Sequence, residues 1–439
     1  MNAVAALPGK LRQLANLASF VRDPLAYLSR ESAGAPVSRI NLPGSSVFVV
    51  NDVELIRRIL IRDVAHFDKG AQYDRLRPLL GDAVSLARGP AHRDRRRLLQ
   101  PVFHHDRVDS YTTLMRAATL EAIDGWKDGE IVAVDDAMRS ISLNVAARTL
   151  CSTVPGERTT LTVQQDLPRI LNGLTWRALN PFPVLERIPL PANQEFGRAT
   201  RRLRTGIAEL VAKRSRQDRS GDDLIHLLIR AYGDDAEAQA RVCDDAINLL
   251  LAGTETTGNA LCWVWHLLAG HPQVEARVHL AATEGDGEYL GWVIKEALRI
   301  YPPAWLIPRR VVKALNLGPC ELPVGSLVFF SPYLLHRSPE IYESADAFRP
   351  ERWEPGASPA PSPHAFLTFG AGPHNCIGAR FATTEMVAVV QTIAERYRLL
   401  PAGETAVRPS ATLVPTRLHM RVERRHAQGR QNETGPCGN

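Results

Sequence analysis

A short cysteine-containing segment restricts the fold and chemistry of this chain more than any other part of its 439 residues. Residues 369–378 read Phe-Gly-Ala-Gly-Pro-His-Asn-Cys-Ile-Gly, so three glycines flank Cys376. Glycine adopts backbone conformations closed to other residues and lets a planar group approach the backbone closely. The residues after Cys376 look helical, which places the sulfur near a helix N-terminus, where free N–H groups and the helix dipole favour a thiolate. For an isolated cysteine, a buried structural role beside a glycine turn is the simpler interpretation.

The complete pattern of this segment, Phe-x-x-Gly-x-x-x-Cys-x-Gly, resembles the haem-binding signature of the cytochrome P-450 family. The resemblance implies that Cys376 is the axial ligand of the iron in haem b, because a thiolate supplies the electron density that favours O–O cleavage. It also implies that the cofactor is contacted by the loop residues Phe369, Gly370, His374 and Gly378. The other five cysteines form no Cys-x-x-Cys pair and no evident disulfide framework, so we expect free thiols and a cytoplasmic location.

An apolar stretch from Asp244 to Leu268 predicts a long helix with an unusual interior. A glycine in the middle of a helix costs about 1 kcal/mol relative to alanine, and an acidic residue with threonines in an apolar helix invites a functional interpretation. The family has an oxygen-binding groove of the pattern Ala/Gly-Gly-x-Asp/Glu-Thr. The resemblance implies room for O2 at the first two positions, a hydroxyl that holds it, and a carboxylate that delivers protons. The matching residues are Ala252, Gly253, Thr256 and Glu255, the last standing where many relatives have Asp. A packing glycine beside a solvated glutamate is the alternative.

A Glu-x-x-Arg pair, Glu296 and Arg299, precedes the cysteine segment on a helix that ends near Ile300. By itself such a pair is a common i,i+3 ion pair on a solvated helix face. In the family, this pair is joined by an arginine from an irregular segment, and Arg352 in Pro-Glu-Arg-Trp occupies that place. The resemblance implies a structural charge cluster that fixes the core beneath the haem.

Four basic residues are expected around the haem propionates. His92 and Arg96 lie four apart on a predicted helix over 91–99, hence on one face. His374 and Arg309 match further propionate contacts of the family, although Arg310 is an equal candidate for the second position. Each residue alone is weak evidence, because basic side chains are usually just solvated.

The walls of the substrate pocket follow from the family order of motifs, with one wall expected in the 168–185 region. The other residues that we expect in the walls of the substrate pocket are Leu79, Leu80, Ile247, Leu251, Trp305, Leu306 and Val414. Their character indicates a hydrophobic, uncharged substrate. The segments 67–70, 79–81 and 190–193 resemble those of bacterial members that oxidise cyclic terpenes, while fatty acids, steroids and macrolides remain open.

The remaining sequence predicts a mainly α protein with small β-sheets, one of them built from distant segments. Short strands are expected within 36–50, 304–312 and 326–333, an irregular segment over 337–368, and an N-terminal helix broken near Asp23-Pro24. The resemblance implies the cytochrome P-450 fold, with haem between the long distal helix and the proximal helix after Cys376. We expect one domain over residues 1–425 and a disordered tail over 426–439.

The resemblance implies a monooxygenase that uses O2 and takes electrons from NAD(P)H through a separate ferredoxin reductase and ferredoxin, since no flavin domain is fused. The net charge of +6 suits an acidic ferredoxin, with Arg93, Arg95 and Arg97 as candidate contacts. No nucleic-acid motif and no run of eighteen apolar residues occurs, so neither nucleic acid nor a transmembrane anchor is expected. A peroxygenase or isomerase is disfavoured by the Glu-Thr pair, and a haem sensor by the lack of an output domain.

Overall fold

The computed structural model of the protein describes residues 9–425, apart from 43–44, 152–164, 168, 172, 175–176, 178–182, 187, 217–222, 360–361 and 363. The expected tail over 426–439, and much of the 168–185 region, lie outside the described residues. Among the described residues, no helix is both long and apolar enough to cross a membrane.

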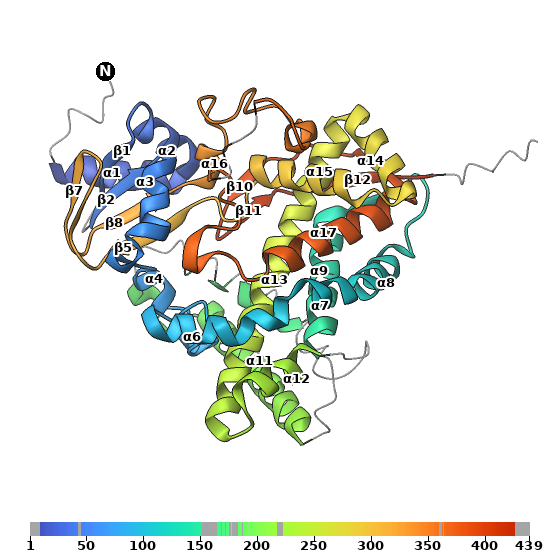
Figure 1. Ribbon diagram of the computed structural model, residues 1–439, viewed down its shortest axis with the longest axis horizontal. Coiled ribbons are helices and arrows are strands. Elements are labelled where there is room, and N and C mark those ends of the chain that lie inside the picture. Colours follow the sequence, from blue (N-terminus) through green and yellow to red (C-terminus); the bar gives the residue numbers. More distant parts are fainter. Residues whose placement is uncertain are drawn as a thin grey trace, which may run out of the picture.

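Helices form most of the molecule (Figure 1). The described α-helices are α1 (Gly9–Arg22), α2 (Pro24–Ser32), α3 (Val53–Arg57), α4 (Ala71–Asp74), α5 (Arg77–Leu80), α6 (Gly89–Leu99), α7 (His105–Ser110), α8 (Thr112–Ile123), α9 (Val134–Cys151), α11 (Pro191–Ser215), α12 (Leu224–Tyr232), α13 (Ala236–Gly270), α14 (Pro272–Glu284), α15 (Gly287–Ile300), α16 (Pro332–Leu335) and α17 (Ala379–Ala394). Two short 3-10 turns matter for the site: η6 (Pro350–Trp353) and η7 (Gly372–His374).

The described strands form four small sheets, of which the largest lies at the left of Figure 1, whereas β12 lies at the right. The strands are β1 (Val37–Leu42), β2 (Ser45–Val50), β3 (Phe67–Asp68), β4 (Ile131–Ala133), β5 (Ile307–Val311), β6 (Leu315–Leu317), β7 (Cys320–Leu322), β8 (Leu327–Phe330), β9 (Tyr397–Pro401), β10 (Val407–Pro409), β11 (Leu413–Pro415) and β12 (His419–Arg424). The largest sheet has the order β1-β2-β8-β5-β3, with β2 and β8 parallel, and the others are β4-β12-β9, β6-β7 and β10-β11. The predicted α-rich class with a sheet built from distant segments is confirmed.

Local sequence explains the helix break near the N-terminus. Asp23 caps α2 by accepting a hydrogen bond from the Ala26 N–H at 3.0 Å, and Pro24 fills the first helical position, where no N–H partner is needed. The predicted break is therefore confirmed. The irregular segment before the cysteine loop is also confirmed, apart from η6.

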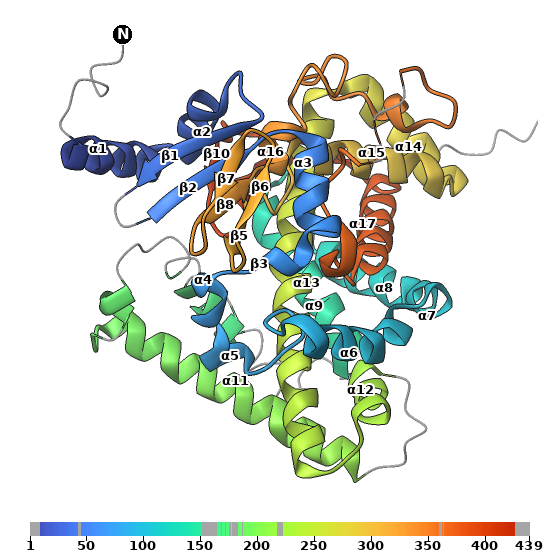
Figure 2. The ribbon, with the colours of Figure 1, turned by 60° about the vertical axis from the view of Figure 1, so that its left-hand side comes forward.

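The long helix α13 organises the interior and crosses the molecule (Figure 2). It begins at Ala236, eight residues before the expected start, because the Asp235 carboxylate caps it by accepting from the Ala238 N–H at 2.8 Å. The first two turns alternate small or apolar residues with Glu237, Gln239 and Arg241, and therefore lack the continuous apolar character on which the prediction rested. Its second half packs in a core with α8, α9, α15 and α17, whereas its first half packs in a second core with α5, α11 and α12. Residues 252–257 lie between these two cores, so this stretch is free to face a cavity.

Candidate active site

A cavity of about 430 Å³ lies between α13 and the cysteine loop. Its walls come from α6, the middle of α13, residues 303–309, residues 368–378 and the start of α17. Most of this lining is apolar, and its polar residues include five basic side chains, several hydroxyl and amide side chains, and the cysteine. The cavity thus occupies the place expected for haem, between the long distal helix and the helix after Cys376.

The cysteine loop is held in a sharp conformation that presents Cys376 to the cavity. The Cys376 N–H donates to the Phe369 carbonyl at 2.7 Å, and Gly370 and Gly372 have φ values of 69° and 68°. A Cβ on Gly372 would lie 2.3 Å from the Leu60 carbonyl oxygen, so only glycine fits there. Burial raises the pKa of the Cys376 thiol, while the Gly378 N–H and the Arg96 guanidinium lower it.

The middle of α13 provides the opposite wall. Ala252, Gly253 and Thr256 line the cavity, and a Cβ on Gly253 would meet only open space. The Thr256 hydroxyl donates to the Ala252 carbonyl at 2.6 Å. Glu255 does not line the cavity, since its Oε1 accepts a hydrogen bond from the Thr412 hydroxyl at 2.8 Å. Burial raises the pKa of Glu255, and the Thr412 hydrogen bond lowers it.

The four expected basic residues, His92, Arg96, Arg309 and His374, all line the cavity. The His92 and His374 rings lie 4.0 Å apart, and the Arg96 Nη2 donates to the Asn375 Oδ1 at 2.6 Å, which ties α6 to the cysteine loop. Burial lowers the pKa of His92 to about 4 and that of His374 to about 3. Both histidines are therefore neutral at pH 7 in this arrangement.

The structure separates the two arginines that the sequence left equal. Arg309 is 9% exposed, lines the cavity, and has no ion pair among the described residues; its Nη1 donates only to the Pro308 carbonyl at 2.8 Å. Arg310, its neighbour on β5, points away and pairs with Asp68, with 3.0 Å from Nε to Oδ1. Burial lowers the pKa of Arg309 because a buried charge without a partner is costly.

Lys69 is a cavity residue whose role sequence reasoning missed. Burial and the neighbouring Arg309 guanidinium lower the pKa of Lys69 to about 8. The loop that contains it was expected only to form part of the pocket wall, and the two-residue strand β3 (Phe67–Asp68) directly before it is too short to be predicted from the sequence. Lys69, Arg309 and the unpartnered, buried Nδ1 of His374 surround one side of the cavity. These donors fit the carboxylates of haem propionates, since buried cations and unsatisfied donors require anionic or polar partners.

The structure brings Glu296, Arg299 and Arg352 together in a buried cluster. The Arg299 Nε and Nη2 donate to the two Glu296 oxygens at 3.0 and 2.9 Å, and the Arg352 Nε donates to Glu296 Oε1 at 2.8 Å. The Trp353 Nε1 and the Arg349 N–H complete the shell of the carboxylate at 2.9 and 3.1 Å. The cluster joins α15 to η6 and the irregular segment.

His336 links this cluster to the cysteine loop. Its Nδ1 lies 3.1 Å from the Arg299 carbonyl oxygen, and its Nε2 accepts from the Leu367 N–H at 2.9 Å. Burial lowers the pKa of His336 to about 3, so the ring is neutral. A neutral tautomer with its proton on Nδ1 satisfies both bonds.

The seven residues expected as pocket walls do not line the cavity. Four of them pack in the core behind its wall: Leu79, Leu80, Ile247 and Leu251. Trp305 and Leu306 belong to another core cluster, where the Trp305 Nε1 donates to the Ser410 carbonyl at 2.8 Å, and Val414 lies on β11. The same segments reach the cavity through Val84, Leu250 and Ile307. Neither β11 nor the described residues of the 168–185 region line the cavity. For the other three segments, the packed structure decides which face reaches it.

The segment 79–85 is fastened to α13 by three side chains that sequence reasoning missed. Asp244 accepts from the Asp82 N–H at 2.9 Å, Asp245 accepts from the Val84 N–H at 2.7 Å, and Asn248 accepts from the Ser85 hydroxyl at 2.5 Å. These bonds fix the cavity wall at Val84 and Ser85.

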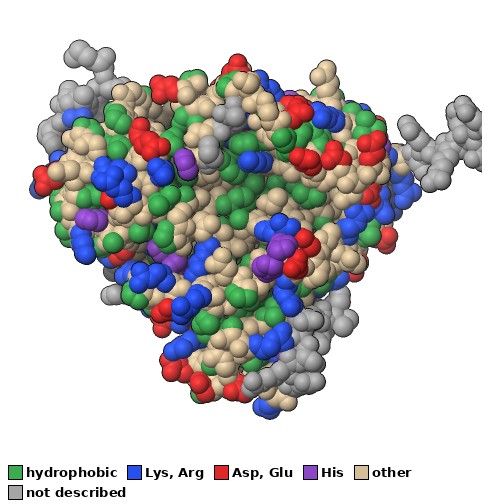
Figure 3. All heavy atoms as spheres, viewed as in Figure 1, with side chains coloured by type: hydrophobic (Ala, Val, Ile, Leu, Met, Phe, Trp, Pro, Cys, Tyr) green, Lys and Arg blue, Asp and Glu red, His purple; other side chains and the backbone are tan. Residues whose placement is uncertain are grey.

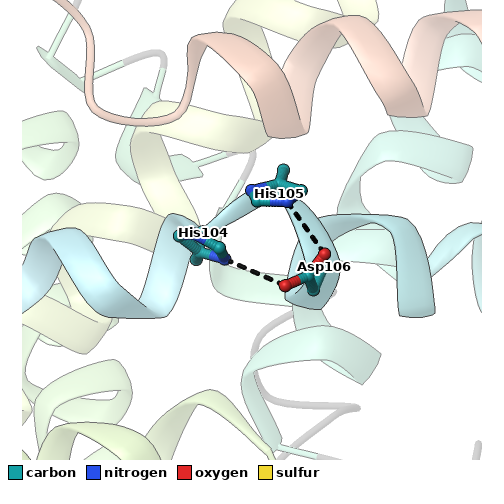
Figure 4. A group of neighbouring side chains, drawn as sticks. All are labelled: His104, His105 and Asp106. Atoms are coloured by element: carbon teal, nitrogen blue, oxygen red, sulfur yellow. Dashed lines mark ion pairs between the residues drawn. The ribbon is translucent and has the colours of Figure 1, made fainter.

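One exposed cluster of possible metal ligands, His104, His105 and Asp106, lies at the start of α7 (Figure 4). The His104 Nδ1 is 3.4 Å and the His105 Nε2 is 2.9 Å from the two carboxylate oxygens. None of the three residues lines the cavity.

Comparison with known proteins identifies the family. The family model described as Cytochrome P450 matches residues 24–420. The cyclooctat-9-en-7-ol 5-monooxygenase of Streptomyces melanosporofaciens is 36% identical over 91% of this chain and 90% of that protein. The pentalenene oxygenase of Streptomyces avermitilis is 33% identical over 95% and 97% of the two chains.

Solved structures give the same result. CYP175A1 from Thermus thermophilus matches with a TM-score of 0.76 and 26% identity over 93% of this chain and 97% of that chain. The heme domain of cytochrome P450DA has the same fold, with a TM-score of 0.82 and 21% identity over 93% of each chain. The protein belongs to the cytochrome P450 family and is a haem-dependent monooxygenase.

Proposed function

We propose that Cys376 would hold haem b through its thiolate and that the chain oxidises an apolar terpenoid. The observation that carries the first part is the arrangement of the cavity, with one cysteine on one wall and the Ala252–Thr256 groove on the other. When bound, haem with a thiolate ligand supplies the oxygen-activating chemistry. The basic side chains Lys69, Arg309 and Arg96 line the cavity and would bind the propionates and orient the cofactor.

The chain itself organises protons and excludes water. Thr256 presents its hydroxyl at the cavity wall, next to the space left open beside Gly253. Glu255, one residue earlier, holds a proton in a half-buried site and passes it toward the Thr256 side of the helix. A positioned proton donor typically contributes about 100- to 10,000-fold to a rate.

An apolar terpenoid substrate is supported by two observations. The cavity wall on the side of α13 is mostly apolar, with Val84, Leu250, Ala304 and Ile307 beside the hydrogen-bonded pair of Ser85 and Asn248. Two relatives are named for cyclic terpenes, as a cyclooctat-9-en-7-ol 5-monooxygenase and a pentalenene oxygenase. Burial of apolar surface at about 25 cal/mol per Å² drives the binding of such a molecule.

A ligand titration tests the substrate class. Cyclic sesquiterpenes and diterpenes, fatty acids and steroids are titrated against the holoprotein, and the Soret band is followed. We expect the terpenes to shift the band toward high spin and to give oxidised product with NAD(P)H, reductase and ferredoxin. A shift with fatty acids alone would refute the terpenoid proposal and leave the family assignment intact.

The ligand assignment has a separate test. In Cys376→His, the Soret band of the reduced carbon monoxide complex moves away from the position that a thiolate gives. Cys262→Ser, at a cysteine buried in the core, leaves that band in place. An unmoved band in Cys376→His would refute the assignment.

We further propose that an acidic ferredoxin docks on the face that carries α6 and α17. Lys and Arg side chains surround the centre of this face (Figure 3). Arg93 and Arg97 are exposed, whereas Arg95 turns inward, 3.7 Å from the Asp245 carboxylate. Because rim charges mostly affect association, Arg93→Glu should slow reduction by ferredoxin more at low salt than at high salt. Equal slowing at both would refute this docking surface.

Residues 1–425 are proposed to form one functional domain, with 426–439 as a tail outside it. Removing the tail should leave haem content and product formation unchanged. Loss of haem from the shortened chain would contradict this division.

A further inference from the structure

The turn between β10 and β11 reaches α13 at the proposed proton-delivery residue. Thr412, in this turn, is 7% exposed, and its hydroxyl donates to Glu255 Oε1 at 2.8 Å. The hydroxyl oxygen of Thr412 in turn accepts from the Asn259 Nδ2 at 2.9 Å, and Asn259 is 1% exposed. Glu255 and Asn259 lie four residues apart, on one face of the helix, so Thr412 bridges two consecutive turns of α13.

The direction of these two bonds follows from the placement of the Asn259 amide, whose nitrogen faces the Thr412 hydroxyl. A hydroxyl has one proton to donate, and the amide nitrogen of Asn259 can only donate. The Thr412 oxygen therefore accepts from Asn259, which leaves its proton for the Glu255 carboxylate. The described residues offer no donor to Oε2 of Glu255, so this second oxygen stays available for proton exchange.

The turn itself is rigidly attached on two sides. The Trp263 Nε1 donates to the Leu413 carbonyl at 2.9 Å, which ties the turn to α13 one helical turn beyond Asn259. The Leu413 N–H donates to the Pro303 carbonyl at 3.1 Å, and Pro303 lines the cavity. The Thr412 hydroxyl is thus held between the helix and a cavity wall, although Thr412 does not touch the cavity.

The charges around Glu255 are few. Arg139 on α9 lowers the pKa of Glu255 through its charge, but its guanidinium is already paired with Asp135 at 3.1 Å and Asp136 at 2.8 Å. Burial acts in the opposite direction and is the larger effect. Among the described residues, Thr412 is the only group that donates a hydrogen bond to this carboxylate.

We propose that Thr412 is a positioning residue for oxygen activation, which orients the Glu255 carboxylate for proton delivery and is itself oriented by Asn259. This inference rests on the proposed role of Glu255. The hydrogen bond to Thr412 prevents the flexible side chain of Glu255 from rotating away from this position. A proton can then be taken up at Oε2 from solvent and passed toward Thr256 without a search among rotamers.

The experiment compares four variants of the holoprotein. Thr412→Val removes the hydroxyl and keeps the shape, Thr412→Ser restores the hydroxyl, and Glu255→Gln provides the reference without a carboxyl. Thr416→Val is the matched control, because Thr416 lies four residues beyond Thr412 and bonds only the Ala406 backbone.

Two measurements are made on each variant. Infrared spectra are recorded across a range of pH, and the spectrum of Glu255→Gln is subtracted from each of them. The difference follows the titration of the Glu255 carboxyl without any turnover. The ratio of product to NAD(P)H consumed is measured with a cyclic terpene that shifts the Soret band, and peroxide is assayed in parallel.

In Thr412→Val we expect the carboxyl to titrate at higher pH, because the ionised form has lost its donor, and the ratio to fall about ten-fold. Thr412→Ser should restore both values, and Thr416→Val should resemble the parent protein. An equal fall in Thr412→Val and Thr412→Ser would overturn the proposal, because a structural defect alone would explain it.

The failure of each proposal has its own signature. Unchanged coupling in Glu255→Gln overturns the proposed role of Glu255 and this inference with it. Reduced coupling in Glu255→Gln with an unmoved carboxyl titration in Thr412→Val overturns only the positioning by Thr412.

Discussion

Replacing Glu296 by glutamine is the sharpest test of the charge cluster beneath the site. The Glu296 carboxylate is fully buried and accepts five hydrogen bonds, three at Oε1 and two at Oε2. In glutamine, one of these oxygens becomes an NH2 group, which can accept none of them. Whichever way the amide turns, at least two donors therefore face another donor, and Arg299 and Arg352 keep their charges without a counter-ion.

The expected cost follows from that geometry. Breaking a buried ion pair by removing one partner costs about 3–5 kcal/mol, and the stability of a typical protein is only about 5–15 kcal/mol. Glu296→Gln should therefore lower the free energy of unfolding by about 3 kcal/mol or more. Because Arg299 also holds the His336 and Ala345 carbonyls, the loosened cluster should release haem faster as well.

The measurement is urea unfolding of the holoprotein, followed by far-UV circular dichroism and by the Soret band. Glu351→Gln is the matched control, since Glu351 lies in the same turn, η6, but is more than one-third exposed and pairs with Arg277 on the surface at 3.0 Å. A surface pair contributes about 0–1 kcal/mol. If the two variants unfold at the same urea concentration, the reasoning from burial and unsatisfied donors is wrong.

Three further predictions follow from the site. Thr256→Ala should keep haem but lower the ratio of product to NAD(P)H consumed about ten-fold or more. Thr254→Ala should not lower this ratio, because the Thr254 hydroxyl bonds the Leu250 carbonyl in the core; equal ratios in the two variants would contradict the role of Thr256. Arg309→Leu should speed haem transfer to apomyoglobin more than Arg310→Leu does, because only the first side chain lines the cavity; the reverse order would refute the propionate assignment. Burial raises the pKa of Glu385 from 4.5 to about 8, so the folded state keeps a proton that the unfolded state loses. Stability should therefore fall as the pH rises between these values, and Glu385→Gln should remove that fall in urea unfolding measured from pH 5 to 8; an unchanged pH dependence would show that Glu385 titrates normally.

The sequence predicted features that depend on short spacing. The helix break at Asp23-Pro24, the pair at Glu296 and Arg299, and the shared face of His92 and Arg96 all follow from the period of the helix or from local capping. The structure has each of these arrangements. By contrast, strands of three residues, such as β4 and β10, are too short to show alternation and were not predicted.

The sequence by itself determined the family, the helix-rich class, and the residue types on both walls of the cavity, because each of these depends on residues that are close together in the chain. Only the tertiary structure decided which side chains of each segment reach the cavity. Arg309 faces it and Arg310 does not because pairing with β8 fixes the register of β5, and neighbouring residues of a strand point to opposite faces. Likewise, Glu255 meets Thr412 across 157 residues of sequence, a contact that no local pattern specifies and that forms only when the β10–β11 turn packs against α13.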